Sequence, residues 1–207
     1  MAFILPPDLT DELSAVNTLL QAIGEAPVNS IEISESVDVA ATRQTLQEVS
    51  NAVQTQGWWF NREYGMKLTP EATSNEIVLP RNTLKVSKAY DTEQQTGTLR
   101  VSRRAGKLYD PNNSTFVWDG PVWVDLVVKL DWDDLPESAR SYITIRAAKL
   151  YQGRIQTNAL VDRITDGEVL ARLVTLNDEE DEAVRHNELR DNPDTYNRLH
   201  GRARRRT

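Results

Sequence analysis

Apolar residues recur at helical spacing in two segments near the start of the chain. The first segment is predicted to form a helix from about Thr10 to Ile23, with Thr10 as the N-cap and Gly24 just beyond the end. The second runs from Ser36, which can cap a helix, to about Gln56. The apolar residues of each helix form one stripe that needs a packing partner: Leu13, Val16, Leu20 and Ile23 in the first helix, and Val39, Leu46, Val49 and Val53 in the second.

Between residues 58 and 134 the pattern changes to the alternation of apolar and polar residues that is typical of β-strands. In the strongest candidate, residues 122–132, alternate residues are apolar while Asp125 and Lys129 point to the opposite face. One face of this strand is therefore predicted to be core and the other to be solvated. Shorter candidate strands are separated by turn residues and lie at 76–80, 83–90, 98–103, 106–110 and 114–120.

Helical spacing returns after the strands and predicts two further helices. The third begins near Asp134, has Pro136 in its first turn and ends at Gly153. The fourth follows a capping-box sequence, Thr165-Asp166-Gly167-Glu168, and runs to about residue 190. The face of the third helix that is predicted to be buried carries Ala139, Tyr142, Ile143, Ala147 and Leu150.

Two helices, a series of strands and two further helices predict an α+β fold. Neither helical pair can bury its stripes alone, so about four helices are expected to pack as one discontinuous bundle with an inserted antiparallel β domain. We therefore predict a helical domain of residues 1–57 and 135–197, a β insertion domain of residues 58–134, and a basic C-terminal tail of residues 198–207.

The composition limits the kinds of reaction that the chain can catalyse. The 207 residues include no cysteine, which excludes disulfides, thiolate nucleophiles and zinc–thiolate sites, and only two histidines. Neither a phosphate-binding glycine loop nor an apolar run of about 18 residues is present. We therefore expect no catalytic, metal-binding or cofactor-binding residues, no cofactor and no membrane partner.

The formal net charge of −7 conceals an uneven distribution. Removing the five positive charges of the tail leaves −12 for the rest of the chain. An acidic body argues against ordinary binding of duplex DNA, which needs cations against phosphates. The tail could contact nucleic acid, another copy of the chain or an acidic partner, and its arginines are Arg198, Arg202, Arg204, Arg205 and Arg206.

Three other features have both a functional and a structural interpretation. Acidic residues beside Trp132 could serve a glycoside hydrolase, which needs two carboxylates at a sugar bond, but strand-end and helix-capping roles explain them more simply. The five consecutive acids at residues 178–182 indicate a solvated helix face or a patch for a basic partner. The aromatic residues 58–60 could stack on a base or sugar, although core packing is the simpler role. The acids beside Trp132 are Asp131, Asp133, Asp134 and Glu137.

Several stretches, taken in order, resemble the tail tubular protein A family of short-tailed, podovirus-type bacteriophages. The resemblance covers roughly residues 10–190, and its strength lies in the ordered set rather than in any single motif. It leaves the arginine tail outside. The stretches are ELSAVNTLLQAIGEAPV, QGWWFNREYGMKLTPE, GKLYDPNNSTFVWDG, LDWDDLPESARSYI and DEEDEAVR.

The resemblance implies a structural virion protein that acts as a tail adaptor, also called a gatekeeper or head-tail connector. Such a protein forms a dodecameric ring beneath the portal, carries the nozzle protein (tail tubular protein B) and extends the DNA-ejection channel. It is assembled in the host cytoplasm, and genomic DNA passes through it without sequence-specific binding. On this basis the tail arginines are candidate portal contacts, and surplus acids are expected to face the lumen. The alternatives are a tail-associated polysaccharide-degrading enzyme and a DNA clamp that binds through the tail.

Overall fold

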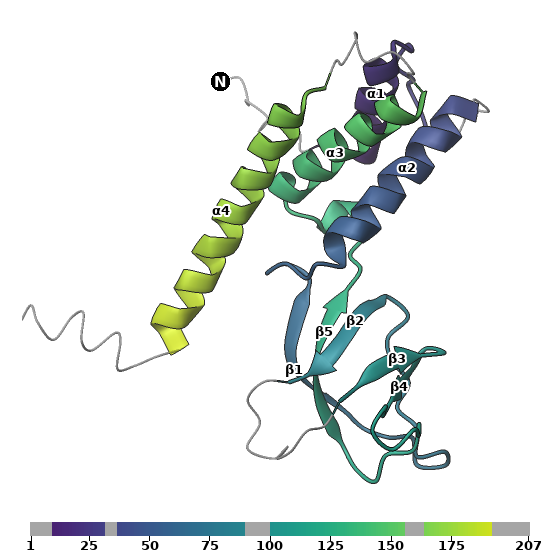
Figure 1. Cartoon of the computed structure of the whole chain (residues 1–207), viewed down its shortest axis with the longest axis vertical. Coiled ribbons are helices and arrows are strands. Elements are labelled where there is room, and N and C mark those ends of the chain that lie inside the picture. Colours follow the sequence, from purple (N-terminus) through teal and green to yellow (C-terminus); the bar gives the residue numbers. More distant parts are fainter. Residues whose placement is uncertain (1–9, 32–36, 90–99, 156–163, 192–207) are drawn as a thin grey trace, which may run out of the picture.

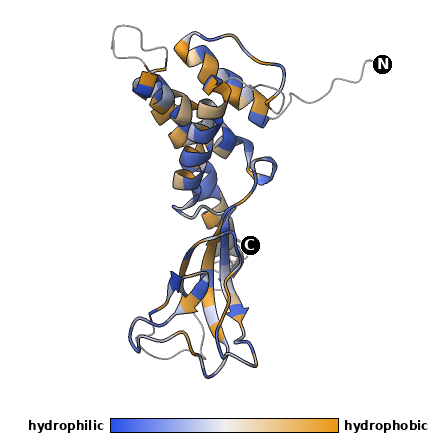
Figure 2. Ribbon diagram, turned by 90° about the vertical axis from the view of Figure 1, so that its right-hand side faces the viewer, coloured by the Kyte–Doolittle hydropathy of each residue, from blue (hydrophilic) through white to orange (hydrophobic). Residues whose placement is uncertain are grey.

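The computed structural model describes residues 10–31, 37–89, 100–155 and 164–191, with side chains given as far as Val184. Helices and strands lie at opposite ends of the long axis, joined by a narrow junction (Figures 1 and 2). The α+β class predicted from the sequence is confirmed. The helices are α1 (Glu12–Ile23), α2 (Val37–Gln54), α3 (Glu137–Ile155) and α4 (Asp166–Asp191), with a short 3-10 turn, η1, at Trp132–Asp134; the strands are β1 (Arg62–Leu68), β2 (Thr83–Lys88), β3 (Ser102–Arg104), β4 (Lys107–Tyr109) and β5 (Val122–Val128).

The start of α1 differs from the prediction by one residue. Asp11, not Thr10, is the N-cap, because its carboxylate accepts a 2.6 Å hydrogen bond from the backbone N–H of Ser14. Thr10 instead binds a distant residue of α3, as described below. At the other end, Gly24 adopts the predicted left-handed conformation with φ 90° and its N–H bonds back into the last turn.

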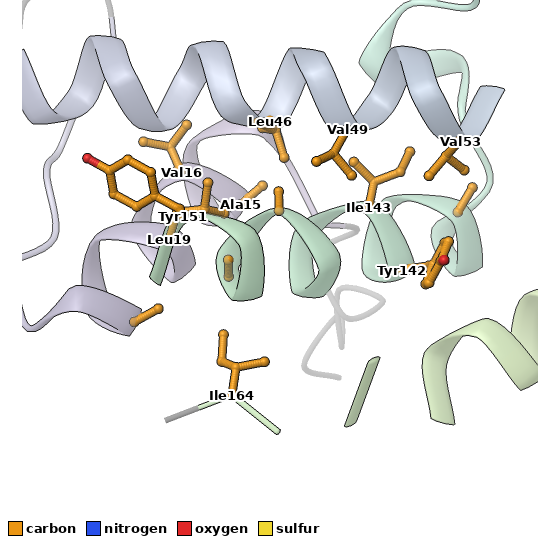
Figure 3. Packing of buried hydrophobic residues seen from close by; sticks show 14 of the residues in the cluster. Ala15, Val16, Leu19, Leu46, Val49, Val53, Tyr142, Ile143, Tyr151 and Ile164 are labelled. Atoms are coloured by element: carbon orange, nitrogen blue, oxygen red, sulfur yellow. The ribbon is translucent and has the colours of Figure 1, made fainter. Parts of the chain in front are cut away.

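Helix α3 lies at the centre of the bundle and contacts α1, α2 and α4. Figure 3 shows α2 directing Leu46, Val49 and Val53 toward α3, with Ile143 of α3 lying between the two helices. The predicted stripe of α2 is therefore confirmed as core. In α1 the core positions are Ala15, Val16, Leu19, Leu20 and Ala22, whereas the predicted Leu13 and Ile23 are only partly buried.

Two details of α3 correct the prediction. Leu150 is 37% exposed, and the neighbouring Tyr151 is buried in its place. Gly153 does not end the helix, which continues to Ile155. Because partners cover α3 on several sides, its buried positions are not confined to the single stripe that an amphipathic helix would show.

The Tyr151 hydroxyl is buried and has no hydrogen-bond partner among the described residues. Burial raises the pKa of Tyr151, and the charges of Asp38 and Glu25 add to the effect. Replacing Tyr151 by phenylalanine removes the unsatisfied hydroxyl and keeps the ring, so we expect the free energy of unfolding to rise by about 1 kcal/mol. Urea unfolding at pH 7 measures this change, and a loss of stability would show that the hydroxyl is satisfied in solution.

The β part consists of two layers with an apolar core between them. One layer is an antiparallel sheet with the order β1-β5-β2. The other is the β3-β4 hairpin, extended by residues 76–79 and 115–118 through isolated bridges. The predicted strands at 76–80 and 114–120 thus form only single bridges. The core residues are Ile77, Leu79, Leu108, Trp118, Val122, Val124, Leu126 and Val128.

Strand β1 is absent from the sequence-based set of strands. Its residues are mostly exposed, so they lack the alternation that identifies a strand. Gly65 interrupts the strand at an irregularity in its pairing with β5, where its N–H donates to the Asp125 carboxylate at 2.9 Å. Pairing with β5, not the local pattern, makes this segment a strand.

Strand β5 has the predicted buried face, and its other face is not uniformly solvated. Val127 on that other face is 5% exposed. Gly57 covers it: a Cβ on Gly57 would lie 2.8 Å from a Val127 methyl group. The backbone at Gly57 has φ +82°, which glycine adopts without strain. The end of α2 therefore closes directly onto β5.

Two buried amide side chains hold the junction between helices and strands. The Gln54 amide donates to the Leu130 carbonyl at 3.2 Å, and its oxygen accepts from the Leu130 N–H at 2.8 Å. The Asn61 amide donates to the carbonyls of Gln54 and Val128, both at 2.9 Å, and its oxygen accepts from Trp58 N–H at 2.8 Å. These bonds join residues 54–61 to residues 128–130 much as a β-ladder would, and the amide oxygen and nitrogen of both side chains have hydrogen-bond partners.

Asp110 organises the turn that follows β4. Burial raises the pKa of this carboxyl, but hydrogen bonds from the Asn113 side chain and from the backbone N–H groups of Asn112 and Asn113 outweigh it, so the net pKa is lowered. The stabilisation is therefore fully present above the ordinary aspartate pKa of about 3.9 and is lost as the pH falls through the folded value.

This sign leads to a measurable pH dependence. Between pH 7 and pH 3 the wild-type protein should lose more stability in urea unfolding than the Asp110→Asn variant, whose side chain does not titrate. The exposed Asp119→Asn variant serves as the control and should retain the wild-type difference. Equal losses for wild type and Asp110→Asn would contradict the assignment.

Candidate functional site

The acidic segment with Trp132 anchors the start of α1. The Trp132 indole N–H donates to the Thr10 carbonyl at 3.0 Å. Both oxygens of Glu137 accept hydrogen bonds from Thr10, one from its N–H at 2.9 Å and one from its hydroxyl. Of the predicted hydrolase residues, Trp132 and Glu137 therefore have structural roles.

A buried arginine completes this anchor. Arg140 is 6% exposed, and its guanidinium donates to the carbonyls of Leu135 at 2.8 Å, Asp133 at 2.6 Å and Thr10 at 3.5 Å. It therefore links the 3-10 turn, α3 and Thr10, which precedes the N-cap of α1. Five donors in a planar fork suit this arrangement, and lysine could not reproduce it.

Asp131 and Asp133 line a hollow of about 310 Å³ between the helices and the end of β5. Glu12 and the cations Arg43 and Lys129 also line it, and Arg43 pairs with Glu12 at 2.9 Å. Asp134 does not line the hollow. The structure thus brings together two of the four carboxylates proposed for sugar hydrolysis, in a site of mixed charge.

The acidic run of α4 has two distinct functions. Glu180 accepts the Trp59 backbone N–H at 2.7 Å, and Glu179 accepts the Ser138 hydroxyl. Asp178, Asp181 and Glu182 are exposed. The interpretation of the run as a solvated face is therefore wrong for two of its five residues, which bind α4 to the junction and to α3.

Helix α4 begins with the predicted capping box. The Glu168 carboxylate accepts from the Thr165 N–H at 2.7 Å, and Thr165 Oγ1 accepts from the Glu168 N–H at 3.2 Å, so the prediction is confirmed. Leu176 is fully buried, whereas Leu170 and Val174 are 60% and 49% exposed. At about 1.5 Å per residue the helix is about 39 Å long. Figure 1 shows its C-terminal half extending away from the other helices toward the level of the strands.

The aromatic run packs against the helical core. Trp58 is buried and its indole N–H donates to the Val53 carbonyl at 2.9 Å. Trp59 and Phe60 are partly buried and meet edge to face, with ring centroids 5.0 Å apart. The core interpretation is confirmed, and no ring of the three is presented as a stacking platform.

The tail arginines lie outside the described residues, as does His200; the side chain of His186 is likewise not described. The portal contacts predicted at Arg198, Arg202, Arg204, Arg205 and Arg206 therefore stay a prediction. Within the described part of the chain, no helix is long and apolar enough to cross a membrane.

A basic surface in the β part was missed from the sequence. Residues 81–89 and 100–107 contain no acidic residue, although Asp91 and Glu93 occur in the undescribed stretch between them. Residues 1–57, by contrast, contain eight acids and one cation, Arg43. Counting charge by segment would have found this surface. We call it the basic edge, and it consists of Arg81, Lys85, Lys88, Arg100, Arg103, Arg104 and Lys107.

The outer face of the β3-β4 layer exposes apolar side chains. Val78 is 55% exposed and Val117 is 50% exposed. Val78 pairs with Lys107 and Val117 with Glu76 in the isolated bridges, and Lys107 forms an ion pair with Glu76. The two exposed valines thus lie beside this ion pair on the outer face of the β3-β4 layer.

Comparison with known proteins determines the family. The family model described as "Tube: Tail tubular protein" matches residues 13–186. The chain belongs to the tail tubular protein family. The resemblance found in the sequence is thereby confirmed, and the family indicates a structural protein of bacteriophage tails.

One relative within the tail tubular proteins is tail tubular protein A of Klebsiella phage KP34. The chain is 33% identical to it over 132 residues, which cover 64% of this chain and 66% of the relative. The aligned region thus spans just under two thirds of the relative's length.

Proposed function

We propose that this protein forms a dodecameric adaptor ring in the phage virion. The ring joins the portal to the nozzle protein, tail tubular protein B, and extends the channel through which genomic DNA leaves without sequence-specific binding. Assembly takes place in the host cytoplasm. The observation that carries this proposal is the family match over residues 13–186. The hydrogen bonds by which Trp132 and Glu137 hold Thr10 support it, because they give these two candidate hydrolase residues a structural role.

The two ends of the molecule suit two different partners. We propose the helical domain of residues 1–57 and 135–197 and the β insertion of residues 58–134 as the units that meet them. The exposed Val78 and Val117 support the β insertion as the nozzle-facing or outer surface. The exposed acids of the helical domain support an acidic lumen, because DNA slides past like charge without adhering.

Electron microscopy of the protein mixed with its portal tests the ring directly. We expect a coaxial ring added to one end of the portal. Portal particles that remain bare in the presence of excess protein would refute the adaptor role. Adding the nozzle protein in a second step tests the other face, since it should bind the portal only when the ring is present.

The arginine tail has its own test. A chain that lacks residues 198–207 should bind the portal more weakly than the full chain in a pull-down, by at least about tenfold if the tail pairs with portal acids. Changing the tail arginines to glutamine should reproduce the loss, and changing them to lysine should largely restore binding at low salt. Unchanged capture of the portal by the truncated chain would place the contact elsewhere.

A further inference from the structure

We propose that neighbouring copies in the ring contact each other through unlike charged surfaces. The basic edge of one copy binds the acidic face of α4 in the next copy. This inference rests on the ring proposed above and specifies its copy-to-copy interface. Its chemistry is charge pairing between arginine or lysine and carboxylates that are exposed in the single chain.

The basic edge is built from two adjoining edge strands. β2 is the outer strand of its sheet, and β3, the outer strand of the hairpin, contacts it. The Arg103 guanidinium donates to the Thr83 carbonyl at 2.7 Å, and the Arg104 guanidinium lies 3.8 Å from the centre of the Tyr109 ring. These contacts hold both guanidinium groups in place before a partner arrives, which lowers the entropy lost on binding.

The acidic face of α4 is also held in place. Glu179 and Glu180 bind α3 and the junction, so the helix cannot rotate about its own axis. Asp178 and Glu182, one turn apart, are exposed. By holding the helix, Glu179 and Glu180 also fix the side of α4 on which the Asp178 and Glu182 carboxylates lie.

The two surfaces lie on opposite sides of the molecule. In Figure 1, α4 descends on the side of β1, and β2 and β3 lie on the other side. A contact between two different surfaces on opposite sides is heterologous, and such contacts close into rings when the rotation between copies allows. The C-terminal half of α4 reaches the level of the β part, so the two surfaces can meet between copies standing side by side.

The charge distribution favours a second copy over DNA as the partner. DNA would have to approach a chain with a net charge of −7, and the like charges of the helical part would oppose it. A second copy carries the required acids as the exposed Asp178 and Glu182 of α4. Each basic edge in a closed ring would then be neutralised by the next copy.

Charge reversal provides the test. One variant carries Arg81→Glu, Lys85→Glu and Arg100→Glu, and a second carries Asp178→Lys and Glu182→Lys; all five side chains are exposed. Each variant alone places like charges opposite each other at the substituted positions of every contact, so we expect at least about a tenfold loss of ring assembly on the portal. An equimolar mixture should assemble again, because the two variants can alternate around a ring with an even number of subunits. Lys67→Glu with Arg172→Glu is the matched control and should assemble as wild type.

A cross-link tests the same contact without the portal. The chain has no cysteine, so Lys85→Cys combined with Glu182→Cys introduces the only two thiols. Oxidation of the concentrated protein should produce a ladder of disulfide-linked copies, and either single cysteine variant should stop at the dimer. Equal circular dichroism spectra and melting temperatures confirm that each variant is folded.

The outcomes separate the interface from the adaptor role. If both charge variants form rings alone as well as wild type, the interface is wrong and the ring stands. If the wild type leaves the portal bare, the adaptor role fails and the cross-link alone decides the contact: a ladder supports it, and its absence overturns it. If the Arg81, Lys85 and Arg100 variant instead loses salt-dependent binding of duplex DNA while its rings are intact, the basic edge is a DNA surface and the inference is overturned.

Discussion

Replacing Asn61 by alanine should lower the free energy of unfolding by about 3–5 kcal/mol. Asn61 is 1% exposed, and its side chain satisfies two carbonyls and one N–H at the junction of helices and strands. Alanine removes all three bonds: the buried Trp58 N–H loses its partner, and the carbonyls of Val128 and Gln54 lose one bond each, although Gln54 still accepts from the Gly57 N–H at 3.1 Å. An unsatisfied buried group costs about 1–3 kcal/mol, and each further lost bond about 0.5–1.5 kcal/mol. Urea unfolding followed by circular dichroism and by tryptophan fluorescence measures the loss.

Asn82→Ala is the matched control. Asn82 is exposed, and its amide makes one hydrogen bond, 3.1 Å from the Lys129 carbonyl. Water can replace that bond, so we expect a change of less than about 1 kcal/mol. A loss for Asn61→Ala as small as for Asn82→Ala would show that the junction does not depend on the buried amide.

The Gly57→Ala substitution should cost about 3 kcal/mol through a different mechanism. A Cβ at this position would lie 2.8 Å from the Val127 methyl group and 2.9 Å from the Arg62 guanidinium. The backbone φ of +82° adds conformational strain of about 1–2 kcal/mol for a residue with a side chain. Overpacking accounts for the remainder, typically about 1–3 kcal/mol. The midpoint of urea unfolding should therefore fall, with its slope unchanged.

Alanine substitutions at two other glycines separate the cost of backbone strain from the cost of steric overlap at Gly57. Gly65 has φ +61° with nothing within 4 Å of the added carbon, so Gly65→Ala should show the strain alone, about 1–2 kcal/mol. Gly153 lies within α3 in open space, so Gly153→Ala should stabilise the protein by about 0.5–1 kcal/mol. If Gly57→Ala costs no more than Gly65→Ala, the close approach to Val127 is not a constraint in solution.

Patterns in the sequence predicted the elements whose signals are local. The stripe of α2, the glycine that ends α1 and the capping box at Thr165 depend on residues within one or two turns, and all are confirmed. The buried face of β5 was predictable for the same reason. The predictions failed where contacts with residues far away in the sequence determine the structure. Strand β1 has no apolar alternation and forms by pairing with β5, and Leu150 faces outward because α3 contacts several neighbouring helices.

The candidate site was less predictable than the fold. Charge counting by segment would have found the basic edge, but the division of labour within the acidic run of α4 has no local signal. Glu180 and Trp59 are 121 residues apart in sequence, and Thr10 and Glu137 are 127 apart. Which carboxylate is an anchor and which is exposed depends on these long-range partners.

Sequence alone thus determined the family, the α+β class and the uneven distribution of charge, since ordered motifs, periodicity and composition can be read from the chain. Tertiary structure decided how the two parts are joined. Gln54 and Asn61 carry no distinguishing pattern in the sequence, and Gly57 is recognisable there only as the residue that stops the second helix. All three hold the junction because β5 returns beside the end of α2. Hydrogen bonds and close packing depend on which atoms meet in space, and only the folded chain brings those atoms together.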